Sequence, residues 1–313
     1  WRYATLLGAS VLFRYSGLAL IPVVFLLGKN RSEGLRLAGC ALIPMMLLGA
    51  HDLLAYGQIH LISMMAFQSV SNTLPDMGHK MVASIAALGG AAALPFLCWQ
   101  KPAQSITGAA IGAGIGCTAA AWTEQSGAAA ISTVVFCAAG AATLAGTLRN
   151  RDRTDRILLS WLGVGLLFLL TLRFTASRYW LPFFAPAVLI GLRAASTTWV
   201  RIACLITPAL GVALAVDDMD LARVQQQAAL RAQVVGAGHI GGHWGFQHHL
   251  EEAGWVPIED DLRLPNGAWV ARSKNAWPQT PSNTCWTNTR VVPLYDPRPG
   301  LRVMTHTGGA NFH

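Results

Sequence analysis

Two arginines stand between apolar runs in the stretch 173–182, Arg-Phe-Thr-Ala-Ser-Arg-Tyr-Trp-Leu-Pro. A guanidinium group is costly at the centre of a bilayer, so Arg178 is expected at an interface or facing a polar cavity. Its planar fork suits an anionic head group there, and Pro182 can begin the next helix at its first turn. The alternative is an interfacial anchor, in which the arginine snorkels while Tyr179 and Trp180 join the aromatic belt.

Three more basic side chains are candidates for the same anionic group. Arg14 lies about ten residues inside the first apolar segment, deeper than anchoring usually requires. His79 and Lys80 stand at the start of another apolar segment. For Arg14 the alternative is a structural ion pair with Asp52 or Asp76, since charges inside a membrane usually find partners.

The C-terminal part contains four histidines that invite a metal assignment: His239, His243, His248 and His249. Glycines interrupt any helix between the first two, and the spacing brings no supporting carboxylate or thiolate to the set. We therefore predict no metal site. We expect His243, Trp244 and Gln247 to form a structural corner, in which the tryptophan buries its ring and satisfies its N–H.

Glycines at 236, 238 and 241 formally match a dinucleotide-binding fingerprint. That fingerprint requires an acidic residue at a strand end about 20 residues further on, and here only a loop-like run containing Asp260 and Asp261 lies near that distance. The pattern is therefore not taken as a nucleotide site.

The composition is that of a membrane protein. Of 313 residues, 53% are hydrophobic and 12% are charged, about half the charged share of a soluble domain. The basic excess lies within residues 1–217, whereas 218–313 carries as many acidic as basic residues. A nucleic-acid partner would need a basic soluble face, so this distribution argues against one. The six cysteines show no CxxC spacing, which indicates neither a zinc site nor a disulfide framework.

The apolar segments predict about eight transmembrane helices, with about 20 residues needed for each span. They cover roughly residues 3–28, 37–56, 80–99, 104–122, 127–147, 157–175, 179–196 and 199–217. The loop between the second and third segments is expected to hold an interfacial helix near residues 61–70, and the Gly/Ala-rich stretch 108–146 is expected to pack closely.

Short basic loops set the predicted orientation. Lys29, Arg31 and Arg36 follow the first segment, and four arginines lie between 149 and 156. The positive-inside rule places these loops in the cytoplasm. By parity, the Arg178 turn and everything after residue 216 then lie outside. We expect an integral protein of the inner or plasma membrane with an extracytoplasmic C-terminal domain.

Beyond residue 217 the pattern changes to helix, strand, helix, strand, which predicts a small α/β domain over 218–313. An amphipathic helix is expected to begin at Asp218 as N-cap, joined to the last span by a short link. A strand is expected over 232–240, and a helix over 246–253 that ends at Gly254. Further strands are expected at 269–271, 291–294 and 301–304.

Two stretches resemble GT-C-type polytopic glycosyltransferases: Arg14 to Pro22 ahead of a basic turn, and Arg178-Tyr179-Trp180-Leu181-Pro182. The second is similar to the Arg-Tyr-x-x-Pro that opens a late helix in the dolichyl-phosphate-mannose–protein mannosyltransferase-like family (glycosyltransferase family 39). Residues 242–247 and 308–312 resemble motifs in the extracytoplasmic tail of bacterial members. His248 and His249 stand where aromatic residues are expected in that family.

The resemblance implies a GT-C-like, all-α membrane domain that transfers a sugar from a polyprenyl-phosphate donor to an extracytoplasmic acceptor. Arg178, Arg14, Lys80 and His79 would hold the lipid phosphate, and no cofactor or divalent metal is indicated beside the lipid-linked donor. The catalytic acidic residue of the family lies in a first outer loop with no counterpart here. We therefore expect the chain to be the C-terminal portion of a longer protein.

Two other classes stay open from the sequence. A polytopic transporter would use broken helices at the membrane midplane and often an inverted repeat. A non-catalytic membrane scaffold would have no need of a buried arginine.

Overall fold

The computed structural model describes residues 2–13, 15–68, 73–90, 97, 102–123, 125, 127–148, 152–172, 177–234, 236–242, 244–258 and 264–273. These residues divide into two compact units, one ending at Val212 and the other beginning at Ala213. The division falls within a single helix, near the predicted boundary at 217.

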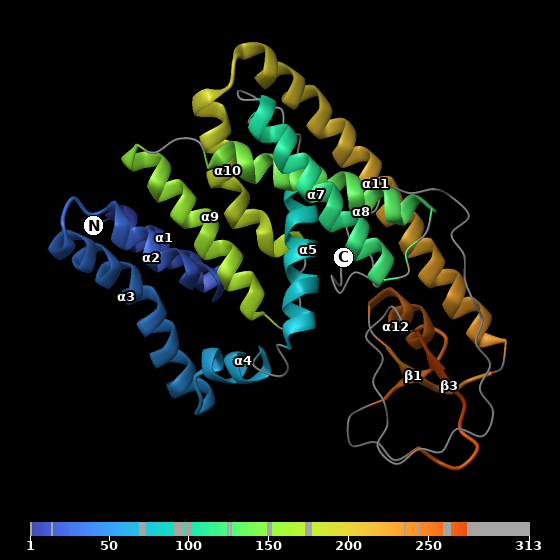
Figure 1. Ribbon diagram of the computed structural model, residues 1–313. Helices are drawn as coiled ribbons and strands as arrows, with labels where there is room; N and C mark the ends of the chain where they lie inside the picture. Colours follow the sequence, from blue (N-terminus) through green and yellow to red (C-terminus); the bar gives the residue numbers. More distant parts are fainter. Residues whose placement is uncertain are drawn as a thin grey trace. The chain divides into compact units, whose positions relative to one another are not determined.

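The first unit is helical throughout its described residues (Figure 1). Its elements are α1 (Arg2–Phe13), η1 (Tyr15–Leu20), α2 (Ile21–Leu27), α3 (Arg31–Tyr56), α4 (His60–Gln68), α5 (Leu74–Gly90), α7 (Pro102–Trp122), α8 (Gly127–Thr147), α9 (Arg153–Thr171), η2 (Ser177–Trp180), α10 (Leu181–Ala194) and α11 (Thr197–Gln233). Within the described residues, five helices are long and apolar enough to cross a membrane, namely α3, α7, α8, α9 and the first part of α11. The chain is therefore that of an integral membrane protein, and the expected count of eight spans is not reached by these criteria.

The predicted single span over 3–28 is wrong. Ala4 of α1 and Val24 of α2 belong to one buried cluster with Ala41 of α3, although a continuous helix would separate residues 4 and 24 by about 30 Å. The chain therefore turns back between α1 and α2, and the 3₁₀ helix η1 lies at the turn (Figure 1). A hydropathy profile does not reveal this reversal, because the chain is apolar both before and after it.

One end of the helical unit gathers ion pairs and carbonyl contacts. Arg153 at the start of α9 donates to the carbonyl oxygens of Leu27 (3.2 Å) and Gly28 (2.7 Å) after α2. Arg193 near the end of α10 pairs with Asp152 just ahead of α9. The basic loops that the sequence assigned to one side of the membrane thus meet at one end of the unit. We call this end the Arg153 face.

The opposite end carries the other set of connections. Because α9 starts and α10 ends on the Arg153 face, the connection between them, including η2, lies at the far end. Helix α8 ends shortly before α9 begins in the sequence, so its last residue lies towards the Arg153 face. The connection between α7 and α8 therefore also lies at the far end. At that end the His79 ring lies against Trp122 of α7, with ring centroids 4.4 Å apart and the planes tilted by 37°. We call it the His79 face.

The loop between α3 and α5 contains the helix that the sequence predicts there. α3 ends at Gly57, whose φ of 71° is the left-handed conformation common after helices. α4 (His60–Gln68) follows, and its Ile62 and Met65 are exposed. A short helix with exposed apolar side chains, placed at one end of the helical unit, is typical of a helix that lies at the membrane interface.

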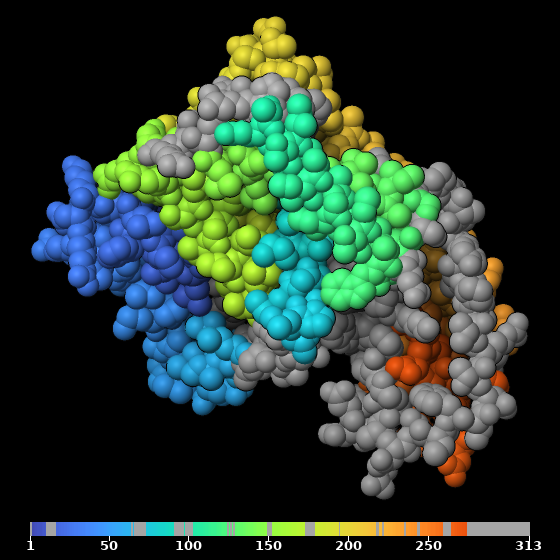
Figure 2. Space-filling model, in the orientation of Figure 1, coloured from blue at the N-terminus to red at the C-terminus, as the bar shows by residue number. Residues whose placement is uncertain are grey.

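Small residues bring α5, α7 and α8 together, as the Gly/Ala-rich sequence predicts. A Cβ added at Gly108 would come within 2.7 Å of the Ala141 carbonyl oxygen, and one at Gly116 within 2.7 Å of the Val134 Cα. Gly112 lies between them on the same face of α7 and meets Cys137. Figure 2 shows α7 and α8 meeting directly on the visible face. These helices approach at backbone distance, which only glycine allows.

The second unit is a small α/β arrangement, as predicted. In its described part, β1 (His239–Gly241) is the central strand of a three-stranded parallel sheet in the order β2-β1-β3, with β2 at Val256–Pro257 and β3 at Val270–Arg272. Helix α12 (Trp244–Glu251) connects β1 to β2, and Gly254 forms the turn after it with φ of 83°. A core of Ile240, Phe246, Leu250 and Trp255 packs against Ala229 of α11.

Two expectations for this unit need correction. Helix α11 runs unbroken through the predicted link and the predicted N-cap at Asp218, because no glycine or proline occurs between 212 and 235. The first strand is confined to 239–241 and does not begin at 232. Gly236 and Gly238 precede β1, whereas a dinucleotide fingerprint follows its strand. The predicted strands at 291–294 and 301–304 lie outside the described residues.

Candidate functional site

The Arg178 stretch forms a 3₁₀ turn that leads directly into a helix. Residues 177–180 are η2, and α10 begins at Leu181 with Pro182 in its first turn, as the sequence predicts. Proline is favoured there because its missing N–H has no partner within the helix. The backbone of Arg178 belongs to η2, and its side chain lies outside the described atoms.

Trp180 does not join an interfacial belt. It is 2% exposed and stacks on Phe184 at a centroid distance of 5.8 Å and an interplanar angle of 15°. Tyr179 is half-buried against the same core. The alternative of an aromatic belt at this turn therefore does not hold for Trp180, because its large apolar ring packs between helices.

The Arg14 stretch has the same local architecture. The residues after Arg14 form η1, and α2 begins at Ile21 with Pro22 in its first turn. Leu20, like Trp180, holds helical backbone angles at the start of the helix that follows. Arg14 itself lies outside the described residues. In each stretch a 3₁₀ turn, with an arginine within it or directly before it, leads into a helix that has proline in its first turn. We call η1 and η2 the arginine-led turns.

Both turns pack into one buried cluster. Ala19 and Leu20 of η1 meet Trp180 of η2 and Phe183 of α10, together with Leu162 and Leu169 of α9 and Ala87 of α5. Residues separated by about 160 positions in the sequence are therefore neighbours in space. The sequence predicts Arg14 and Arg178 as partners in one site, and the described parts of their turns do share a core.

Helix α5 carries buried polar side chains toward this cluster. Lys80 is 2% exposed and Ser84 is fully buried. Together with Ala87 they follow the spacing i, i+4, i+7, so the three lie along one face of the helix. We call Lys80, Ser84 and the adjacent His79 the α5 polar stripe. Ala87 belongs to the same buried cluster as Trp180, so the stripe lies next to the η2 turn.

Several buried polar atoms of α5, α9 and η2 have no hydrogen-bond partner among the described residues. They are Nε2 of His79, Oγ of Ser84, and the indole Nε1 atoms of Trp161 and Trp180. Buried polar groups in native proteins are nearly always satisfied, and exceptions call for a bound water, ion or ligand. A hydroxyl and two indole N–H groups are donors, so a ligand rich in acceptor oxygens would satisfy them.

The two carboxylates considered as ion-pair partners for Arg14 are engaged locally. Asp52 is 6% exposed and accepts a hydrogen bond from the backbone N–H of His60 at 3.3 Å. Asp76 accepts hydrogen bonds from the hydroxyl (2.5 Å) and the backbone N–H (3.1 Å) of Thr73, which caps the start of α5. Each carboxylate thus stabilises the backbone near its own helix end.

The main ion pair of the Arg153 face joins Asp155 to Arg193 and was not among the predicted contacts. Asp155 is 1% exposed, and its Oδ1 lies 3.2 Å from Nε of Arg193, close enough for an ion pair although the angle does not make a hydrogen bond. Asp152 caps α9 through the backbone N–H of Asp155 at 2.7 Å and also pairs with Arg193. The pattern Asp-x-x-Asp at a helix start was the signal for this cap.

In the second unit, the predicted structural corner is only partly described. His243 and the side chain of Trp244 lie outside the described atoms, and Trp244 begins α12. Gln247 donates to Oε1 of Glu251 at 2.7 Å, one turn further along α12. Its amide is thus engaged within the helix.

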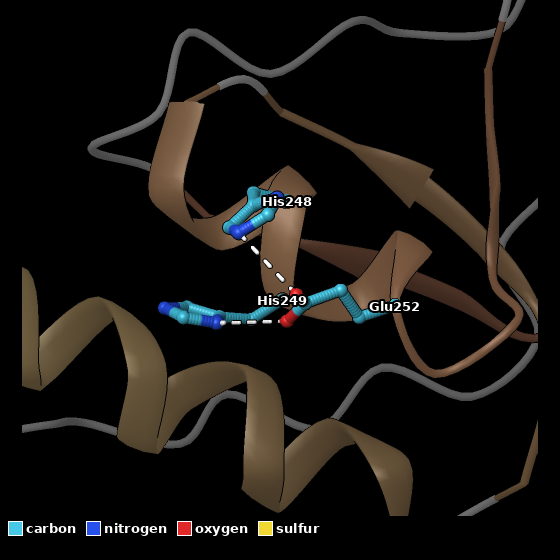
Figure 3. A group of neighbouring side chains, drawn as sticks. All are labelled: His248, His249 and Glu252. Carbon is cyan, nitrogen blue, oxygen red and sulfur yellow. Dashed lines mark ion pairs between the residues drawn. The ribbon is translucent and has the colours of Figure 1, made fainter.

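The same helix brings together a set that sequence reasoning missed. His248 and His249 both lie close to the carboxylate of Glu252 (Figure 3). The sequence prediction of no metal site left out Glu252, which follows His248 at the i+4 position and His249 at the i+3 position. Helical spacing between His248 and Glu252 was the available signal.

Comparison of the chain with protein-family models, with curated proteins and with solved structures gives no match in any of the three.

Proposed function

We propose that this chain is part of an integral-membrane glycosyltransferase that moves a sugar from a polyprenyl-phosphate donor to an extracytoplasmic acceptor. One observation carries the proposal: buried donors without described acceptors surround the cluster where the two arginine-led turns meet the α5 polar stripe. This combination suits an anionic, oxygen-rich group at a membrane interface, with its hydrocarbon tail in the lipid.

The chemistry of such a donor explains the residue types. Transfer of the sugar leaves negative charge on the departing phosphate, and fixed positive charge in a site of low dielectric stabilises it. An arginine at the start of α10 would offer two parallel hydrogen bonds to phosphate oxygens. Lys80 adds a buried amine, and His79 and Ser84 supply further hydrogen-bonding atoms on the same helix.

The test is a binding experiment with the intact chain in lipid nanodiscs. Polyprenyl phosphate and the matching polyprenol, which lacks only the phosphate, are titrated side by side. We expect saturable binding of the phosphate form alone. Equal binding of the two lipids would reject the phosphate site.

A polytopic transporter is the second candidate, and the reversal between α1 and α2 favours it. Transporters bind anions at the N-termini of interrupted helices, and α2 begins at an interruption within one apolar segment. Uptake of a radiolabelled water-soluble sugar phosphate into proteoliposomes, without any dependence on lipid-linked donor, would support transport against transfer.

The proposal also places the His79 face and the second unit outside the cytoplasm. Basic residues gather on the Arg153 face or next to it in the sequence: Lys29, Arg31, Arg36, Arg153, Arg156, Arg193 and Arg201. The positive-inside rule assigns that face to the cytoplasm. In a chain without its native cysteines, an impermeant thiol reagent should label Asn266→Cys in intact cells and Ser32→Cys only after lysis. The reverse pattern would invert the topology.

A further inference from the structure

We propose that His248, His249 and Glu252 form a binding site for a divalent metal ion of the Zn²⁺ class, at the C-terminal end of α12. No metal was predicted from the sequence, and the lipid-phosphate site lies in the other unit. The site therefore stands independently of the proposed transferase activity. It rests on the geometry and the chemistry of the three side chains (Figure 3).

The distances fit a shared ion better than direct contacts. Nε2 of His248 lies 3.5 Å from Oε1 of Glu252, and Nδ1 of His249 lies 3.6 Å from Oε2. All the ligand atoms fall within 4.8 Å of one another. Charge-assisted hydrogen bonds would be shorter, about 2.7–2.9 Å. Tetrahedral ligands at about 2.0–2.1 Å from zinc stand roughly 3.3 Å apart, so a shared ion requires the three side chains to move closer together, by at most about 1.5 Å for any pair.

Helix α12, which carries the two histidines and ends one residue before Glu252, is held firmly by its buried side. Leu250, between the histidines and the glutamate, is fully buried, and Phe246 is 4% exposed. The side-chain amide of Gln233 on α11 donates to the carbonyl oxygen of His249 at 3.3 Å. Ligands on a packed helix are preorganised, which reduces the entropy lost when an ion binds.

Neighbouring carboxylates differ in what they contact. Glu251 accepts the hydrogen bond from Gln247 at 2.7 Å. Glu252 lies instead against both histidines. The pair therefore provides a ligand and a matched control one residue apart.

The donor set indicates the class of ion. Two imidazole nitrogens and one carboxylate suit Zn²⁺, Cu²⁺ or Ni²⁺, whereas Ca²⁺ and Mg²⁺ prefer oxygen ligands. The side chains of His248 and Glu252 are 65% and 63% exposed. Three protein ligands on an open surface leave coordination positions for water or for an oxygen of a bound ligand, as in exchangeable rather than structural zinc sites.

The first test measures Zn²⁺ affinity of the whole chain in detergent, by competition with a chromophoric zinc indicator. Wild type, Glu252→Gln and Glu251→Gln are compared, with equal unfolding temperatures confirming that each variant is folded. We expect Glu252→Gln to weaken the tightest site at least tenfold and Glu251→Gln to leave it unchanged. Equal affinities in wild type and Glu252→Gln, or equal losses in both variants, would overturn the site.

The second test identifies the ligands directly. Cu²⁺ bound at one equivalent should show electron paramagnetic resonance splitting from two imidazole nitrogens in the wild type and from one in His248→Ala. His248 is largely exposed, so this variant is expected to fold, and His249→Ala provides an independent second case. An unchanged nitrogen pattern in both variants would show that copper binds elsewhere and would overturn the proposal.

Discussion

The polar residues at the two ends of the helical unit differ in whether they have partners within the described part of the protein. On the Arg153 face, Arg153 and Arg193 meet carbonyl oxygens and carboxylates of the chain itself, and Asp155 is buried against its partner. Near the His79 face, Ser84 and Trp180 keep buried donors without described acceptors. The first arrangement ties helix ends together. The second leaves hydrogen-bonding capacity that a ligand can use, so charge alone does not distinguish structure from function.

The largest expected effect is on stability, at the Arg153 face. Arg193→Ala would leave the buried Asp155 carboxylate without its cation. Breaking fully buried pairs costs about 3–5 kcal/mol, and because Arg193 is partly exposed we expect a loss of about 2 kcal/mol in the free energy of unfolding. Denaturation in mixed micelles measures it.

Arg201→Ala is the control for that experiment, because Arg201 is an exposed arginine near the same face. It should be close to neutral, and polyprenyl-phosphate binding should persist in both folded variants. An equally small effect in the two variants would contradict the structural role of Arg193.

Lys80→Met should show the opposite pattern. Replacing a buried charge by an apolar side chain of similar length is often neutral for stability, so we expect a change of less than about 1 kcal/mol. Loss of a charged contact to phosphate should weaken polyprenyl-phosphate binding by about 1.5–3 kcal/mol. Unchanged affinity together with reduced stability would place Lys80 among the structural cations.

Ser84→Ala gives a smaller effect of the same kind. The hydroxyl has no described partner, so its removal should not lower stability, whereas a lost hydrogen bond to a ligand weakens binding by about 0.5–1.5 kcal/mol. Lipid titration and thermal unfolding of the same sample measure both quantities. A clear drop in melting temperature would show that the hydroxyl is already satisfied within the protein.

The smallest effect concerns pH and the cap of α9. The backbone N–H of Asp155, aided by the nearby Arg193 guanidinium, lowers the pKa of Asp152 below its ordinary value of 3.8. The folded state therefore favours the charged carboxylate. Its contribution to stability is complete above pH 3.8 and is lost as the pH falls through the lowered pKa.

Asp152→Asn keeps a capping side chain but removes this charge. The stability difference between wild type and variant should stay constant from about pH 8 to 5 and shrink in more acidic solution. A difference that grows on acidification would contradict the lowered pKa of Asp152.

Much of the architecture follows from local signals in the sequence. Pro182 correctly marks the start of α10, Gly254 the turn after α12, and the small residues of 108–146 the close packing of α7 and α8. Each of these signals acts within one turn of helix or through backbone sterics. The strand–helix alternation of the second unit was predictable for the same reason.

Other features depend on contacts that the sequence does not reveal. The reversal between α1 and α2 is fixed by packing against Ala41 of α3, and Trp180 is buried by helices distant in the sequence. The prediction that the histidines bind no metal left out Glu252, although that carboxylate lies one helical turn after His248. The position of the α5 polar stripe next to η2 could not be predicted, because Ala87 and Trp180 of its buried cluster are distant in the sequence.

The most direct measurement compares Arg178→Lys with Arg201→Lys in polyprenyl-phosphate binding to the intact chain. Lysine snorkels as well as arginine but lacks the planar fork that holds a phosphate through two hydrogen bonds. If Arg178 binds the lipid phosphate, Arg178→Lys should lose about 1–3 kcal/mol of affinity, roughly fivefold to 150-fold, while Arg201→Lys binds like wild type. Wild-type affinity in Arg178→Lys would contradict the phosphate site and leave Arg178 as an interfacial anchor.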